Sequence, residues 1–191
     1  MDKNDIVIVT GLPRSGTSLM MQILHSAGID VFIDNIRQPD VSNPNGYFEH
    51  QLVKTIEQDS SWVNNVRGKA IKIVSPLIKY LPENINYKII FMERDLSEII
   101  QSQEKMMLEN ESSDNQVNPN ILKKLFIKDL QQVKAWINHQ PNIKVIFISY
   151  RNIVNEFDKV VSRLEEFLNI SIDQEKTRLI IDKSLYRTKI D

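Results

Sequence analysis

Cysteine is absent from this chain of 191 residues, and histidine and glycine are scarce, with three and five copies. The lack of cysteine excludes disulfides and thiolate zinc sites within the chain, and it suits a reducing compartment. Three histidines are too few for a histidine-rich metal site, so we expect no metal. No apolar run approaches the roughly 20 residues of a membrane-spanning helix, and no leader-like segment precedes the first strand. We therefore expect a cytoplasmic protein without a membrane span.

Neither sign of charge dominates the sequence. The chain carries 24 Lys and Arg against 25 Asp and Glu, for a net charge of −1. It therefore lacks the global basic field that attracts nucleic acid or acidic membranes, and we expect neither as a partner. Hydrophobic residues make up 41% of the chain, which at this length predicts one compact domain over residues 1–191.

The most informative stretch lies near the N-terminus. Four β-branched residues lead into a glycine-bearing turn, and helical spacing follows, in the sequence IVIVTGLPRSGTSLMMQIL of residues 6–24. A strand, a tight loop and a helix in this order form a cradle for an anion, because the loop N–H groups and the helix dipole point at one place. Gly11 and Gly16 let the backbone approach that anion closely.

The side chains of this loop narrow the type of anion. Arg14 adds a fixed positive charge, and Thr17 and Ser18 supply hydroxyl donors. In a nucleoside-triphosphatase loop, a lysine directly after the second glycine reaches the outer phosphates, and the next hydroxyl holds magnesium. Thr17 occupies that lysine's position here. The loop therefore suits an anionic group of a nucleotide but is poorly equipped for Mg-ATP.

Apolar strands alternate with helical patterns along the rest of the chain. We expect strands from Ile6 and over residues 69–74, 87–92 and 143–149. We expect helices over residues 17–28, about 49–62, 95–109, about 119–139, 153–168 and about 173–182, and an irregular loop over 29–48. This pattern predicts a three-layer α/β fold with a mainly parallel sheet and a P-loop-like strand–loop–helix start. Ligands bind beyond the carboxyl ends of such strands, so residues 10–18, 74–76, 93–102 and 149–151 should meet at one edge.

A second candidate phosphate site follows the third strand. Arg94 stands at the end of this strand, and Ser102 lies eight positions further on, about two helical turns away. An arginine fork and a hydroxyl can hold one further phosphate from two sides. The alternative explanation for the arginine is an ion pair with Glu93 or Asp95. With the first loop, the pair favours a nucleotide that is held at two separate phosphates.

The two motifs together resemble those of the sulfotransferases that use 3′-phosphoadenosine 5′-phosphosulfate (PAPS). The residues that resemble the family's 5′-phosphosulfate loop are Gly11, Pro13, Arg14, Ser15, Gly16, Thr17 and Ser18. Arg94 and Ser102 resemble its 3′-phosphate pair at the family's spacing. The segments NPNGYFE of residues 43–49 and RDLSEIIQSQ of residues 94–103 are especially similar to a small bacterial sulfotransferase-like group. The resemblance implies PAPS as donor, an unidentified hydroxyl or amine acceptor, in-line transfer and no metal.

The resemblance also implies catalytic roles. Lys72 resembles the family lysine near the sulfuryl oxygens, and Arg14 would hold the 5′-phosphate as charge grows on it. A histidine follows that lysine by two positions in the cytosolic enzymes, but Val74 stands here and cannot take a proton. Other branches of the family use a glutamate after the first helix. We therefore expect the base to be, in order of preference, Glu49, His50 or Asp34.

Two other functions stay open at this point. One is a P-loop kinase of a small metabolite, which predicts magnesium dependence and a lysine after Gly16. The other is a catalytically silent nucleotide-binding module, suggested by Val74 and by the absence of glycine after Gly68. The cytosolic enzymes carry a glycine-rich segment there that touches the 3′-phosphate. In this chain the tail residues Lys183, Arg187 or Lys189 are the electrostatic substitutes.

Overall fold

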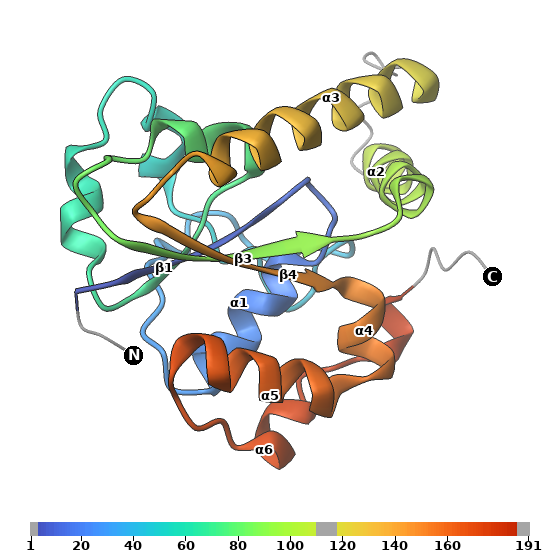
Figure 1. Cartoon of the computed structure of the whole chain (residues 1–191). Coiled ribbons are helices and arrows are strands. Elements are labelled where there is room, and N and C mark those ends of the chain that lie inside the picture. The colour runs from blue at the N-terminus through green and yellow to red at the C-terminus, as the bar shows by residue number, and fades with distance from the viewer. Residues whose placement is uncertain (1–3, 110–117, 187–191) are drawn as a thin grey trace.

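The computed structural model describes residues 4–109 and 118–186. Its centre is one sheet of four parallel strands in the order β2-β1-β3-β4 (Figure 1). The strands are β1 (Ile6–Gly11), β2 (Ala70–Lys72), β3 (Tyr87–Glu93) and β4 (Ile143–Ser149). Every residue of β1 is buried, because neighbouring strands flank it on both sides and layers of helix cover both faces. The predicted parallel α/β architecture and its four strands are confirmed.

Alternate residues of the strands pack into two separate cores. Val7 and Val9 contact the layer formed by α1 (Thr17–Ser26), α4 (Tyr150–Asn155) and α5 (Phe157–Leu168). Ile6 and Ile8 contact the opposite layer, formed by α3 (Pro119–Asn138) and three short 3₁₀ helices. Figure 1 shows α3 on one side of the sheet and α1, α5 and the short α6 (Gln174–Arg178) on the other. The remaining helical elements are α2 (Leu96–Glu109) and a final 3₁₀ turn, η5 (Lys183–Leu185).

The predicted helix over residues 49–62 is wrong. Two 3₁₀ helices occupy this region, η1 (Gln51–Thr55) and η2 (Ser61–Val66), and a third, η3 (Ser75–Tyr80), follows β2. The buried pairs Val53–Ile56 and Val63–Val66 are each three residues apart. This spacing places both members on one side of a 3₁₀ helix, whereas an α-helix would need a stripe with alternating steps of three and four.

Two further helix predictions need correction. The stripe over residues 153–168 belongs to two helices, because Glu156 leaves helical geometry with φ −133° and ψ 43° and separates α4 from α5. In α3, Leu125 has a helical spacing with Leu122, Val133 and Ile137 that predicts a place on the apolar side, yet it is 54% exposed. Val133 and Ile137 near the end of α3 are buried against the sheet, whereas the beginning of the helix extends beyond the strands (Figure 1).

Within the described ranges 4–109 and 118–186, no helix is long and apolar enough to cross a membrane. The same ranges contain no cluster of three or more acidic, histidine or cysteine side chains that could hold a metal ion.

The two glycines of the first loop are needed because protein atoms crowd them. A Cβ on Gly16 would lie 2.5 Å from Cδ2 of Tyr150, the first residue after β4. A Cβ on Gly11 would lie 2.6 Å from the carbonyl oxygen of Met92 and 2.6 Å from Oγ of Ser15. The sequence explained both glycines by the approach of an anion. The structure adds that they let the loop pack closely against β3 and the start of α4.

We expect Gly16→Ala to lower the free energy of unfolding by about 2–4 kcal/mol, because it combines a left-handed φ of 97° with a collision against Tyr150. The matched control is Gly28→Ala. Gly28 also has a positive φ, of 83°, but a Cβ there would meet nothing within 4 Å. The control should cost only about 1 kcal/mol. Urea denaturation measures the free energy of unfolding of both variants. Equal losses would show that the Tyr150 ring can move aside at no cost in stability.

Candidate active site

A cavity of about 320 Å³ opens at the carboxyl edge of the sheet. All four strand ends contribute to its wall. After β1 these are Pro13, Arg14 and residues 16–18; Lys72 and Val74 belong to β2 and its end, Arg94 follows β3, and Tyr150 follows β4. The predicted meeting of these segments at one edge is confirmed. The volume lies at the lower end of the range of about 300–1,000 Å³ that is typical of small-molecule sites.

The wall of this cavity carries an excess of positive charge, although the chain as a whole has a net charge of −1. The basic residues in the wall are Arg14, Arg37, Lys72, Arg94 and Lys105, and the acidic ones are Glu49 and Asp182. Charges of one sign in a concave site focus the field and raise the local concentration of an anionic ligand. The cavity is therefore suited to anions with more than one charge.

The start of α1 faces this cavity without a competing anion. Gly16 is the N-cap of α1, makes no side-chain capping bond, and no acidic residue occupies the first turn. Thr17 and Ser18 of this turn line the cavity. The first N–H groups of a helix have no intrahelical partner, so they can bind an anionic group there. Gly11 and Ser15, also predicted to contact the nucleotide, are buried and are not part of the described cavity wall.

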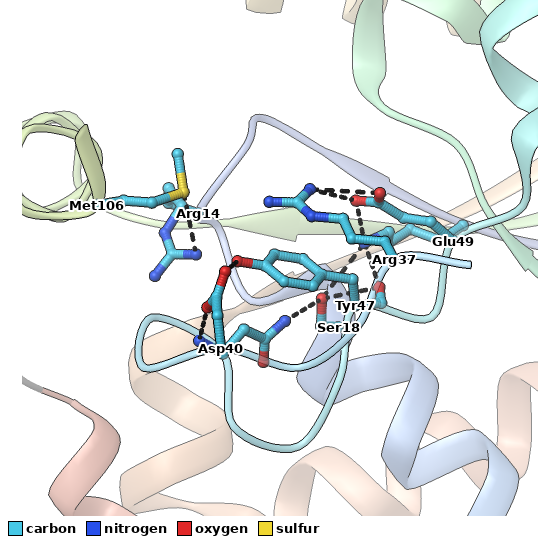
Figure 2. Close-up of polar contacts among 9 residues, drawn as sticks. Arg14, Ser18, Arg37, Asp40, Tyr47, Glu49 and Met106 are labelled. Atoms are coloured by element: carbon cyan, nitrogen blue, oxygen red, sulfur yellow. Dashed lines mark hydrogen bonds and ion pairs between the residues drawn. The ribbon is translucent and has the colours of Figure 1, made fainter. Parts of the chain in front are cut away.

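Arg14 joins the two predicted phosphate motifs. Its Nε donates a hydrogen bond of 3.0 Å to Oγ of Ser102 on α2, and its Nη2 donates one of 3.0 Å to the carbonyl oxygen of Ser42. Its third nitrogen lies 3.9 Å from the sulfur of Met106, as Figure 2 shows. Arg14 adopts a left-handed φ of 68°, and the carbonyl oxygen of this strained residue accepts a bond of 3.0 Å from Nη1 of Arg94.

Arg94 is held in a buried ion pair. Its Nε lies 2.9 Å from Oε2 of Glu98, and the two side chains are only 8% and 5% exposed. The hydroxyl of Tyr186 donates a bond of 2.7 Å to the other oxygen of Glu98. The guanidinium carbon lies 4.4 Å from the ring centre of Tyr150 and 5.2 Å from that of Tyr186. Arg94 therefore lines the cavity from a fixed position.

The sequence offered Glu93 and Asp95 as alternative partners of Arg94, and the structure uses both elsewhere. Glu93 pairs with Lys134 on α3 at 2.6 Å. Asp95 accepts bonds from the N–H groups of Ser97 and Glu98 at the start of α2. The partner that the sequence missed, Glu98, is four residues after Arg94, which places the two side chains on the same face of one helical turn.

Lys72 and Glu49 form the second charged centre of the cavity. Nζ of Lys72 is buried and donates to Oε1 of Glu49 at 3.0 Å, to Oγ of Ser18 at 3.3 Å and to the carbonyl oxygen of Tyr47. Burial lowers the pKa of Lys72 below its usual range, although the Glu49 carboxylate opposes this shift. Burial raises the pKa of Glu49, but the charges and hydrogen bonds of Lys72 and Arg37 outweigh it, so the net pKa is lowered. Glu49 is therefore ionised at neutral pH and able to accept a proton.

Of the three predicted bases, the structure brings Glu49 to the cavity and places the other two outside its wall. Nδ1 of His50 accepts a bond of 3.2 Å from the N–H of Leu52, and its ring stacks on Phe32 at 4.2 Å. Asp34 accepts bonds from the N–H groups of Ile36 and Gln51. His50 and Asp34 thus hold the segment that carries Glu49.

Several residues of the site escaped the sequence reasoning because they lie in the irregular loop 29–48. Arg37 lies over the ring of Tyr47, 3.3 Å from its centre, and its Nη1 lies 3.3 Å from each oxygen of Glu49 (Figure 2). The hydroxyl of Tyr47 donates a bond of 2.7 Å to Asp40. The aromatic pair before Glu49 was the one available signal that this segment is ordered.

Other predictions fall on parts of the chain that the structure does not describe. Arg187 and Lys189 lie outside the described residues, as does the side chain of Lys183. The same holds for residues 110–117, between α2 and α3.

The fold and the site thus define a parallel α/β protein with a basic, phosphate-type cavity at the sheet edge. Residues 3–189 match the sulfotransferase domain family, and the chain belongs to that family. No curated protein matches the sequence.

Several solved structures, including the following three, resemble the fold. Mouse sulfotransferase SULT7A1, complexed with PAP, is 17% identical, with a TM-score of 0.58 over 93% of this chain and 62% of that one. Retinol dehydratase with androsterone and the inactive cofactor PAP is 17% identical, with a TM-score of 0.53 over 94% and 64%. The sulfotransferase domain from the curacin biosynthetic pathway is 16% identical, with a TM-score of 0.53 over 90% and 76%. The chain therefore spans less than two thirds of the length of the first two structures. At these identities the likeness concerns the fold alone.

We expect Glu98→Gln to lower the free energy of unfolding by about 2–4 kcal/mol, because it removes the negative charge that lies 2.9 Å from the buried Arg94 guanidinium. The matched control is Glu93→Gln, whose ion pair with Lys134 is about 40% exposed on both sides. This control should cost under about 1 kcal/mol. Chemical denaturation at pH 7 measures both values, and a loss from Glu98→Gln as small as that of the control would contradict the structural role of the pair.

Proposed function

We propose that this chain is a sulfotransferase that moves a sulfuryl group from PAPS to a hydroxyl or amine of an acceptor. One observation carries the proposal: the hydrogen bond of 3.0 Å between Arg14 and Ser102, which brings a 5′-phosphate-type loop and a 3′-phosphate-type pair to one cavity. A nucleotide with phosphates on both ends of its ribose requires two such sites at a short separation. A simple mononucleotide site would not need the second.

The residues present fit each end of such a donor. The first N–H groups of α1 and the side chain of Thr17 suit the 5′-phosphosulfate. At the other end, Oγ of Ser102 accepts from Arg14, so its own proton is free to be donated to a 3′-phosphate; among the described residues nothing accepts it. Arg94 adds a fixed guanidinium to the wall of the same cavity.

The reaction needs positioning and charge stabilisation more than covalent chemistry from the protein. The acceptor oxygen or nitrogen forms a bond to sulfur, the bond between sulfur and the 5′-phosphate oxygen breaks, and its electron pair leaves with 3′-phosphoadenosine 5′-phosphate (PAP). Glu49 takes the proton of the acceptor. Lys72, hydrogen bonded to Glu49 at 3.0 Å, stabilises charge on the moving sulfuryl group, and Arg14 holds the 5′ side.

A catalytically silent nucleotide-binding module is the second candidate. Val74 lines the cavity where the cytosolic enzymes carry a histidine, and Glu49 is held by two cations. Such a module would bind PAP with the same residues and transfer nothing to any acceptor.

We expect wild-type protein to bind PAP with higher affinity than adenosine 5′-monophosphate. We expect its affinity for ATP to be the same with and without magnesium. Ser102→Ala should lower the affinity for PAP by about tenfold, which corresponds to the loss of one hydrogen bond to a charged group. The affinity for adenosine 5′-monophosphate should stay almost unchanged. Isothermal titration calorimetry measures these affinities, and a thermal-shift panel with and without magnesium supports them.

The control for this variant is Ser162→Ala, an exposed serine on α5 whose hydroxyl only bonds the carbonyl oxygen of Asp158. It should bind both nucleotides like wild type. Equal weakening of the two nucleotides by Ser102→Ala would remove the 3′-phosphate assignment. Tighter binding of Mg-ATP than of PAP would instead favour the kinase.

We expect Glu49→Gln to keep PAP affinity within about twofold and to lower turnover by about 10²–10⁴-fold, the usual contribution of a general base. Release of PAP from the donor, measured with a panel of alcohols, phenols and amines, gives the rates. Glu175→Gln, at an exposed position on α6, serves as the matched control and should turn over like wild type. An unchanged rate in Glu49→Gln would assign the base to another residue, and PAP binding without any transfer by wild type would favour the silent module.

A further inference from the structure

A second cavity, of about 300 Å³, adjoins the first within the loop that ends at Glu49. The two cavities share four wall residues: Arg37, Asn45, Tyr47 and Glu49. Figure 2 shows Arg37 above the Tyr47 ring with its guanidinium directed at the Glu49 carboxylate. The carboxylate that we assign as base therefore stands between the two cavities.

The charges of the second cavity do not cancel locally. Among its described wall residues, Arg37 and Glu49 are the charged ones. Glu49 already has a cation on its inner side, because Nζ of the buried Lys72 lies 3.0 Å from Oε1. Arg37 thus brings a second positive charge to a carboxylate that is already paired, and the Asp40 carboxylate outside this wall also interacts with it.

Arg37 also has hydrogen-bonding capacity left over. Its side chain is 44% exposed, and Nη1 makes two long contacts of 3.3 Å to the oxygens of Glu49. In the described part of the chain, Nε and Nη2 have no hydrogen-bond partner. Stacking on Tyr47, at 3.3 Å from the ring centre, keeps the guanidinium plane in place. A fixed planar fork with spare donors suits a carboxylate or phosphate group.

The remaining wall combines polar amide groups with apolar residues, including Ile33 and Pro39. Asn35, Gln38 and Asn45 add amide groups, and Asn35 has a left-handed φ of 56°. Phe48, also in this wall, has a φ of 53°. Strained positions of this kind concentrate where a binding surface has to be held in a particular shape.

We propose that the second cavity receives the acceptor, and that Arg37 selects a small acceptor that carries a carboxylate or phosphate close to its reacting hydroxyl or amine. This inference rests on the proposed function. An anion bound to Arg37 competes with Glu49 for the guanidinium, so the arriving acceptor loosens the outer ion pair of the base. Glu49 then takes the acceptor proton as the new bond to sulfur forms and the bond from sulfur to the 5′-phosphate oxygen breaks.

The test uses matched probe pairs that differ in one charge: 4-hydroxybenzoate against 4-hydroxybenzamide, and glycerol 3-phosphate against glycerol. Affinities are measured by NMR titration of the protein saturated with PAP, so that the first cavity cannot take up the anions. We expect the anionic member of at least one pair to bind about tenfold tighter or more to wild type. Arg37→Gln should bring this ratio to about one, and Arg37→Lys should leave an intermediate ratio.

Arg67→Gln is the matched control, because Arg67 is exposed and bonds only Asn4 and Asn64 away from the cavities. It should retain the wild-type ratio. Equal affinity of wild type for both members of each pair, no binding of either anion at about 10 mM, or a ratio that survives Arg37→Gln would overturn the proposal. A failure of the proposed function would be seen separately, because the protein would then not bind PAP. In that case the titrations are done without nucleotide, and the affinity ratios of wild type and Arg37→Gln still test the role of Arg37.

Discussion

The hydrogen bond from Arg94 to the carbonyl oxygen of Arg14 is the constraint on which the site depends. It holds the strained Arg14 in the loop after β1, while Glu98 and the rings of Tyr150 and Tyr186 hold Arg94 itself. Arg14 in turn reaches Ser102, two turns along the helix that begins just after Arg94. The loop and α2 therefore form one rigid unit. A phosphate site needs this rigidity, because hydrogen-bond donors that are already in place lose little entropy on binding.

Charge is distributed over the site in pairs with different degrees of burial. The Arg94–Glu98 pair is almost fully buried and close to neutral as a unit, so its main effect is geometric. Lys72 is also buried, whereas Arg37 on the other side of Glu49 is largely exposed. The inner cation is therefore the more firmly held of the two, and the proposed exchange of partners concerns the outer one.

Much of the fold was predictable from local patterns. Mostly apolar runs identified all four strands, because strands covered on both faces carry few polar side chains. The helix predicted over residues 49–62 was wrong because short 3₁₀ helices bury residues three apart, a spacing that also occurs in every α-helix. For the site, Arg14, Lys72, Arg94, Ser102 and Glu49 were all predicted, and the structure brings them to the wall of one cavity. Their roles as nucleotide and catalytic residues are still predictions.

The sequence by itself determined the strand–loop–helix cradle and the two phosphate-type motifs, because each depends on residues that are close together in the chain. The alternation of apolar strands with helices predicted the parallel sheet. Only the tertiary structure decided that Arg14 bonds Ser102, that Glu98 rather than Glu93 or Asp95 pairs with Arg94, and that Arg37 lies against Glu49. The contact between Arg14 and Ser102 joins residues 88 positions apart, and Arg37 lies in a loop without periodicity. No local pattern encodes these last two contacts, since they arise from the packing of the whole sheet edge.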